Sequence, residues 1–246
     1  MEETVKITLL VSSLLNLLFL LLGTIFVAKR GGITYIFSKL AFLQRFPSSV
    51  DAICDTPFYQ DKKSHFETLP KTEAEIIFLG DSLTDLCEWS EIFRNDRIKN
   101  RGICGDTTDG ILNRITNIVK SQPKKIFIMI SINDLNQGRE VKTILDNYKQ
   151  ILDVFKTQIP ETKIYLQSVL PVNKRFNKTE INEKIVQLNA KLKDLAKEFS
   201  VQYIDLFSYF LDQNNELDVR YTLDGVHLNG EGYLLWKKII EKDVVN

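Results

Sequence analysis

Residues 76–84 read IIFLGDSLT, and this stretch determines how the rest of the chain is interpreted. Its first half is a short apolar run, which is typical of a buried β-strand, and the run stops at Gly80. The acid Asp81 and the hydroxyl of Ser82 follow directly. Ligands of open parallel sheets bind beyond the carboxyl ends of the strands. The stretch therefore predicts a strand that carries Ser82 to a sheet edge where chemistry can be done.

The region from Glu75 onward alternates apolar runs with amphipathic segments. Regular alternation of strand and helix is typical of a parallel sheet covered by helices on both faces. We therefore expect an α/β domain with a five-stranded parallel sheet. The strands are predicted at residues 76–79, 98–101, 126–130, 164–169 and 201–204, and helical spacing is found at residues 111–119, 141–155, 181–199 and after Gly230.

Small, polar and acidic residues follow the predicted strands. Residues 102–106 (GICGD) follow the second strand, and residues 131–134 (SIND) follow the third. A late loop with residues 224–227 (DGVH) precedes the final helix. Because the carboxyl ends of parallel strands meet at one edge of a sheet, we expect these segments to form one site with Ser82.

A serine hydroxyl is a weak nucleophile and needs a base. His227 can supply the base, and Asp224, three residues earlier, can hold the imidazole in the required tautomer. A tetrahedral intermediate also needs hydrogen-bond donors for its oxyanion. The backbone N–H groups of Ser82 and Gly105 and the side-chain amide of Asn133 are the candidate donors.

Each of these residues also has an ordinary structural interpretation. Gly105 and Asp224 are typical of turns, and Asn133 is typical of a helix cap. Taken singly, the turn interpretation is favoured for Gly105 and Asp224. Their order along the chain and their common place at one sheet edge favour a catalytic set.

The blocks Gly80-Asp81-Ser82-Leu83, Gly105, Asn133-Asp134 and Asp224-x-x-His227 resemble, in this order, the GDSL or SGNH hydrolase family of serine esterases and lipases. The resemblance covers roughly residues 75 to 240. Residues 167–172 (QSVLPV) and 224–229 (DGVHLN) also resemble members related to the platelet-activating-factor acetylhydrolase type.

The resemblance implies a flavodoxin-like three-layer α/β/α sandwich. It implies a catalytic triad of Ser82, Asp224 and His227, with Ser82, Gly105 and Asn133 as the oxyanion hole, and neither a metal nor a cofactor. The substrate would be a small-molecule or lipid ester, cleaved through an acyl-enzyme. One position departs from the pattern: Ser131 stands where the family usually has glycine, two residues before the asparagine, so the acyl length is left open.

Other functions stay open at this point. A metal-dependent phosphoesterase could use hard oxygen ligands from the aspartates at the strand ends. These are Asp81, Asp85, Asp106, Asp109, Asp134 and Asp224. A non-catalytic binding module on a hydrolase fold is another alternative, because a fold does not fix a function. An α/β-hydrolase is disfavoured because the Ser82 segment lacks the final glycine of the nucleophile elbow.

The N-terminal region has a different character. Residues 7–28 contain no charged residue and are long enough to span a bilayer core, which predicts a transmembrane anchor within residues 1–30. A cleaved signal peptide fits less well because the run is long and acidic residues precede it. A juxtamembrane segment and linker are expected over residues 31–70, and the SGNH hydrolase domain over residues 71–246. The basic residues after the run favour a single-pass protein with a cytoplasmic catalytic domain.

Composition excludes some partners. The 246 residues carry a formal net charge of zero, so there is no general attraction to nucleic acid. The three cysteines, Cys54, Cys87 and Cys104, are widely spaced and imply neither a disulfide framework nor a zinc site. The oligomeric state leaves no signature in the sequence.

Overall fold

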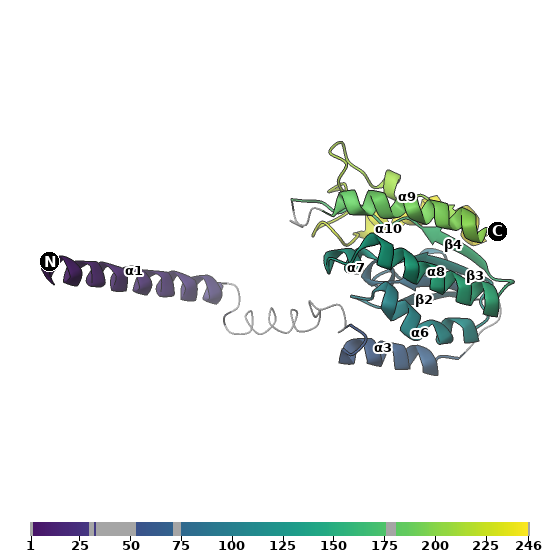
Figure 1. Ribbon diagram of the computed structural model, residues 1–246, viewed down its shortest axis with the longest axis horizontal. Helices are drawn as coiled ribbons and strands as arrows, with labels where there is room; N and C mark the ends of the chain where they lie inside the picture. Colours follow the sequence, from purple (N-terminus) through teal and green to yellow (C-terminus); the bar gives the residue numbers. More distant parts are fainter. Residues whose placement is uncertain (1, 30–31, 33–52, 71–74, 176–180, 246) are drawn as a thin grey trace. The chain divides into compact units, whose positions relative to one another are not determined.

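The computed structural model describes residues 2–29, 32, 53–70, 75–175 and 181–245 (Figure 1). Contacts divide the chain into two compact units, residues 1–47 and 48–246. In the first unit, helix α1 runs from Glu2 to Lys29. Among the described residues, no helix combines the length and the apolar character needed to cross a membrane. The predicted anchor, and the localisation that depends on it, are therefore not supported, and residues 33–52 of the predicted juxtamembrane segment lie outside the described residues.

The second unit is built on a parallel sheet of five strands, which confirms the predicted α/β class. The strands are β1 (Ile76–Gly80), β2 (Ile98–Gly102), β3 (Lys125–Met129), β4 (Lys163–Gln167) and β5 (Gln202–Ile204). Their spatial order is β2-β1-β3-β4-β5, which is the flavodoxin-like order. Gly80 of β1 is in register with both Gly102 of β2 and Met129 of β3. These three strands therefore end level with one another, on either side of the point where the strand order reverses.

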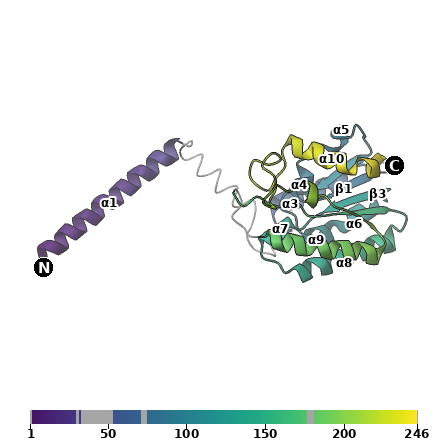
Figure 2. The same cartoon turned by 90° about the horizontal axis from the view of Figure 1, so that it is seen from above.

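Helices cover both faces of the sheet (Figure 2). One face is covered by α6 (Thr108–Lys120), α8 (Val141–Gln158) and α9 (Asn182–Phe199). The other is covered by α5 (Trp89–Ile92) and α10 (Gly230–Val245). Short helices α4 (Ser82–Asp85) and α7 (Ile132–Asn136) follow β1 and β3, and a 3-10 helix spans Phe207–Tyr209. The long helices lie where the helical spacing of apolar residues predicted them.

Alternate residues of the central strands enter two different cores. Ile77 and Leu79 pack under α6, α8 and α9 with aliphatic partners, whereas Phe78 packs on the opposite face. There, Phe78 stacks on Trp89 with ring centroids 4.2 Å apart and on Phe127 at 5.0 Å. This two-sided burial explains why β1 is continuously apolar in sequence.

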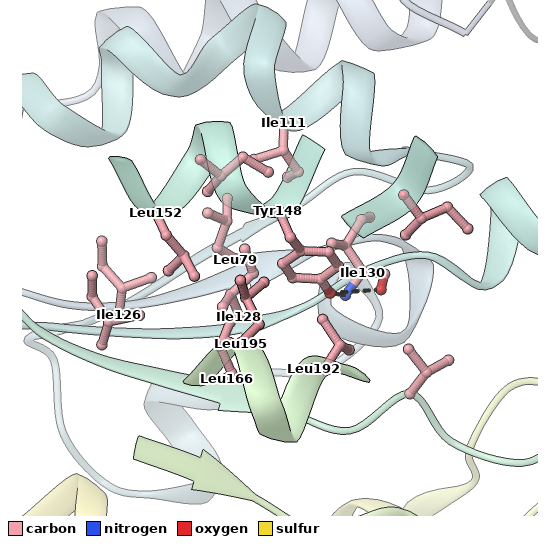
Figure 3. Close-up of a cluster of buried hydrophobic side chains, with 14 of the residues drawn as sticks. Leu79, Ile111, Ile126, Ile128, Ile130, Tyr148, Leu152, Leu166, Leu192 and Leu195 are labelled. Carbon is pink, nitrogen blue, oxygen red and sulfur yellow. Dashed lines mark hydrogen bonds between the residues drawn. The ribbon is translucent and has the colours of Figure 1, made fainter. Parts of the chain in front are cut away.

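Tyr148 of α8 brings a polar group into the aliphatic core (Figure 3). Its hydroxyl donates to the carbonyl of Ile130 at 2.9 Å and accepts from the Ile130 N–H at 3.3 Å. Ile130 is the first residue after β3, where the ladder of the sheet has ended. The tyrosine thus satisfies the backbone at the start of the loop that carries Asn133.

Part of the segment predicted to be a linker is helical and packs on the domain. Helix α3 runs from Pro57 to Thr68 and is capped by the Thr56 hydroxyl, which accepts from the Tyr59 N–H. Tyr59 is fully buried, and its hydroxyl donates to the Gly110 carbonyl of α6 at 2.6 Å. The folded domain therefore includes residues upstream of the first strand.

Replacing Tyr148 by Phe should lower the free energy of unfolding by about 1–3 kcal/mol, because the buried N–H and carbonyl of Ile130 lose their partner. Urea denaturation followed by circular dichroism measures the change. Tyr165→Phe is the matched control, since the Tyr165 hydroxyl makes no hydrogen bond within the described part of the chain. Equal losses in the two variants would contradict this role of Tyr148.

Candidate active site

Ser82 lies where β1 turns into α4. A Cβ atom on Gly80 would collide with the carbonyl oxygen of Met129 and the hydroxyl of Thr84, so only glycine fits at this turn. Asp81 caps α4, its Oδ1 accepting from the Leu83 N–H at 3.0 Å. Ser82 is the first residue of this helix and is 7% exposed.

The structure brings His227 and Asp224 to Ser82. The Nε2 atom of His227 lies 2.9 Å from the Ser82 Oγ, and its Nδ1 lies 2.6 Å from the Asp224 Oδ2. The other oxygen of Asp224 accepts from the backbone N–H groups of Val226 and His227, at 2.9 and 2.8 Å. The Thr222 hydroxyl accepts from the Gly225 N–H at 2.9 Å and closes this loop.

The environment of Asp224 favours its ionised form. Partial burial acts to raise the pKa of Asp224, but the hydrogen bonds from the His227 ring and from the two backbone N–H groups lower it below its ordinary value. The side chains of His227 and Asp224 are 39% and 55% exposed. The contacts that join Ser82, His227 and Asp224 are therefore open to solvent at the end formed by His227 and Asp224.

Gly105 and Asn133 lie together on the loops that follow β2 and β3. Gly105 is buried with φ +82°, in a turn closed by a 3.0 Å hydrogen bond from the Asp106 N–H to the Ile103 carbonyl. Asn133 donates through Nδ2 to the Asp106 carbonyl at 2.9 Å, so the two loops are joined. Neither residue makes a hydrogen bond to Ser82 in the described part of the chain.

Beneath these loops lies a buried network of charged groups that the sequence did not reveal. Asp106 pairs with Arg114 at 2.9 Å, and Arg114 also donates to the Gly80 carbonyl at 3.2 Å. Asp134 accepts from the N–H and the hydroxyl of Thr108. The signal that could have revealed the network is Arg114 itself, an arginine on the apolar face of a predicted amphipathic helix.

The carboxylates that the metal alternative requires are engaged by other groups of the protein. Asp85 pairs with Lys62 and Asp109 with Arg139, while Asp81 caps α4. No group of three or more His, Cys, Asp or Glu side chains within the described ranges is arranged to hold a metal ion.

Burial changes the acidity of these carboxyl groups. It raises the pKa of Asp81 to about 8, and the nearby carboxyls of Asp106 and Asp134 act in the same direction. Burial also raises the pKa of Asp106 and of Asp134 to about 6, against the opposing effects of Arg114 and Thr108 respectively. Burial therefore favours the protonated form of Asp81.

Ser131, the departure from the family pattern, has an unusual backbone. Its φ is +120°, a conformation that side chains disfavour, and the residue is fully buried. The Ser131 hydroxyl has no hydrogen-bond partner within the described residues. Position 131 therefore has a backbone conformation typical of glycine, although its residue carries a side chain.

Replacing Ser131 by Gly should raise the free energy of unfolding by about 1 kcal/mol. Release of backbone strain of about 1–3 kcal/mol outweighs a glycine entropy cost of roughly 0.5–1 kcal/mol. Thermal unfolding measures the change. Ser131→Ala separates the contribution of the hydroxyl from that of the backbone strain, because it removes only the hydroxyl. A Gly variant less stable than the Ala variant would contradict the strain.

The free energy of unfolding should depend on pH through Asp81. A carboxyl whose pKa is raised on folding binds its proton more tightly in the folded state, so its contribution is lost as pH rises from about 4 towards 8. Asp81→Asn keeps the cap and cannot ionise. Its stability relative to the wild type should increase across this range, by at most about 1.4 kcal/mol per pH unit.

Urea titrations at pH 5, 6, 7 and 8 measure this difference. Asp106 and Asp134 act in the same direction but are present in both proteins, so the comparison isolates Asp81. Asp61→Asn, at an exposed position on α3, serves as the control. Parallel pH profiles for Asp81→Asn and the wild type would show that Asp81 is not protonated in the folded protein.

Several known proteins are similar to this chain in sequence. Platelet-activating factor acetylhydrolase IB subunit alpha2 of Rattus norvegicus is 29% identical over 168 residues, which cover 65% of this chain and 72% of that protein. The same subunit of Homo sapiens is also 29% identical over the same coverage. These relatives are named acetylhydrolases.

Solved structures are similar as well. A Streptococcus pneumonia protein, provisionally described as a platelet activating factor, is 31% identical with a TM-score of 0.70, over 76% of this chain and 91% of that one. The acetylxylan esterase Axe2 of Geobacillus stearothermophilus has a TM-score of 0.59 over 71% of this chain and 95% of that one. At 16% identity, it shows the fold alone. Residues 78–235 match the model of the GDSL-like Lipase/Acylhydrolase family, so the chain belongs to this family and is an ester hydrolase.

Proposed function

We propose that the protein is a serine esterase that hydrolyses short-chain acyl esters, such as acetyl esters, or lipid-like esters through an acyl-enzyme. The observation that carries the proposal is the continuous set of contacts from Asp224 through His227 to Ser82. In a Ser-His-Asp triad, the base must reach the hydroxyl, and the acid must orient the base. Both distances are within hydrogen-bond reach in this chain.

The first step is acylation. As the Ser82 Oγ attacks the ester carbonyl carbon, His227 takes the hydroxyl proton at Nε2. The ionised Asp224 holds the ring through Nδ1 and stabilises the imidazolium that forms. His227 then gives the proton to the leaving alcohol. In the second step, His227 takes a proton at Nε2 from a water molecule that attacks the acyl-enzyme carbonyl, and returns it to the Ser82 Oγ as the carboxylic acid leaves.

The oxyanion of each tetrahedral intermediate is stabilised by backbone and side-chain donors. The N–H groups of Ser82 and Gly105 donate no hydrogen bond within the described part of the chain, so both are free for a substrate oxygen. Asn133 uses one amide hydrogen for the Asp106 carbonyl and retains a second. Donors fixed in this way require little reorganisation during the reaction.

An open groove next to α4, lined by apolar side chains and by Glu88, Glu91 and Glu231, is the candidate site for the lipid-like part of the substrate. The groove has a volume of about 700 Å³, and its lining includes Leu86, Ile92, Tyr233 and Leu234. Leu86, which directly follows α4, is 54% exposed. The triad residues are not part of the lining, so the groove would hold a portion of the substrate remote from the scissile bond. The acetylhydrolase relatives support a small acyl group.

The test is hydrolysis of p-nitrophenyl acetate and of longer p-nitrophenyl esters by the full chain. Ser82→Ala and His227→Ala should each lower kcat by a factor on the order of 10⁴ or more, as triad substitutions do. A chelator should have no effect, and a fluorophosphonate should label Ser82 covalently.

Ser90→Ala is the matched control, because Ser90 lies in the neighbouring helix α5 and its hydroxyl makes no hydrogen bond within the described part of the chain. It should retain wild-type activity. Full activity in Ser82→Ala, or activity abolished by the chelator, would exclude the proposed mechanism.

A further inference from the structure

Asp85, one turn after Ser82, connects the helix of the serine to the turn of Gly105. It is the last residue of α4, and its side chain is 11% exposed. Its Oδ2 accepts from the N–H of Cys104, the residue before Gly105, at 3.2 Å. Its Oδ1 accepts from the Lys62 Nζ at 2.7 Å. Both oxygens of this carboxylate therefore hold groups from other elements.

The backbone around Asp85 is tightly packed. A Cβ atom on Gly102 would collide with the backbone nitrogen of Asp85 and lie 2.6 Å from its Cα. The Ile103 N–H donates to the Gly80 carbonyl at 3.1 Å. The chain leaving β2 thus packs directly against the end of α4 and is hydrogen-bonded to the end of β1.

The turn at residues 103–106 determines where the Gly105 N–H points. Cys104 and Gly105 are its two central residues, and the positive φ of Gly105 at the third position is typical of a type II turn. The orientation of the peptide between these two residues depends on the backbone of Cys104. Asp85 holds that backbone through the Cys104 N–H.

Lys62 comes from outside the residues that match the family. It lies on α3 (Pro57–Thr68), whereas the family match begins at residue 78. Helix α3 is fixed on α6 independently of Lys62, through the buried hydroxyl of Tyr59, which donates to the Gly110 carbonyl at 2.6 Å. Within the described residues, the neighbouring Lys63 makes only an exposed hydrogen bond, from its Nζ to the Asn113 side chain at 2.8 Å. Lys62 therefore meets Asp85 from a fixed position.

We propose that Lys62 and Asp85 are a positioning pair, through which helix α3 sets the orientation of the Gly105 N–H as an oxyanion donor. The proposal rests on the proposed esterase function. Lys62 compensates the charge of a mostly buried carboxylate, which allows Asp85 to stay folded inward and accept from Cys104. Without Lys62, the carboxylate gains by turning towards water, and the turn of Gly105 loses its anchor. The catalytic machinery thus extends into the segment upstream of the family domain.

The test compares Lys62→Met with Lys63→Met in the full chain. Both variants remove one α3 lysine, but only the first removes the contact with Asp85. We expect Lys62→Met to lower kcat about 10-fold, less than the 10²–10³-fold that loss of a whole oxyanion donor causes, with KM little changed. Lys63→Met should retain the wild-type kcat, and Lys62→Arg, which keeps the charge, should restore most of it.

A double-mutant cycle with Asp85→Asn tests whether Lys62 acts on kcat through Asp85. Asparagine keeps an acceptor for the Cys104 N–H and removes the charge that Lys62 compensates. In the Asp85→Asn background, Lys62→Met should therefore lower kcat less than 2-fold, because the two residues act through one interaction. Equal 10-fold effects of Lys62→Met in both backgrounds would overturn the proposal.

Hydrogen exchange separates this proposal from the esterase function. Amide exchange in residues 103–106 should accelerate in Lys62→Met and remain at the wild-type rate in Lys63→Met. Faster exchange with unchanged kcat, or equal exchange in the two variants, would overturn the positioning role even in an active esterase. A wild-type protein with no esterase activity would instead overturn the proposed function, while exchange would still report whether Lys62 holds the turn.

Discussion

The parallel register of β1 with its two neighbours is the constraint on which the site depends. Because Gly80 pairs with Gly102 and with Met129, the three strands end together, and their loops begin at one edge of the sheet. Ser82, Gly105 and Asn133 are each within four residues of such an end. A slip of one residue in either pairing would exchange the faces of a strand and separate the loops. The hydrophobic pattern that fixes the register thereby also fixes the relative positions of the polar groups.

Buried polar contacts then hold the loops at that edge. Arg114 reaches from α6 to both the Asp106 carboxylate and the Gly80 carbonyl, and so joins the ends of β1 and β2 from below. Asn133 ties the loop after β3 to the same segment through the Asp106 carbonyl. Burying such charges is costly, and they are retained only with well-placed partners. These contacts serve to orient the loops, which lie beyond the β-sheet hydrogen bonds that hold the strands in place.

The sequence was sufficient to predict the five-stranded architecture and the residues that meet in the site, Ser82, His227 and Asp224, because both leave local signatures. Alternating apolar runs predicted the five strands, and the strand ends indicated Ser82 and the Asp224–His227 loop. Features that depend on tertiary contacts were missed. Helix α3 lay within a segment with little periodicity, because it docks through single contacts such as that of Tyr59. The backbone of Ser131 could not be inferred from its identity, because serine does not ordinarily adopt a positive φ. The apolar residues 7–28 predicted a membrane span that the described helix α1 does not support.

The exposure of the Asp224–His227 side of the site has a consequence for the fate of an acyl-enzyme. Within the described part of the chain, 39% of the His227 side chain is exposed, so bulk water reaches the base directly. Any small alcohol dissolved in that water reaches it equally well. The partition between hydrolysis and acyl transfer at such an exposed base is then governed by the concentrations of the competing nucleophiles. Hydrolysis then predominates in dilute solution, and alcoholysis competes with it where the concentration of hydroxyl groups is high.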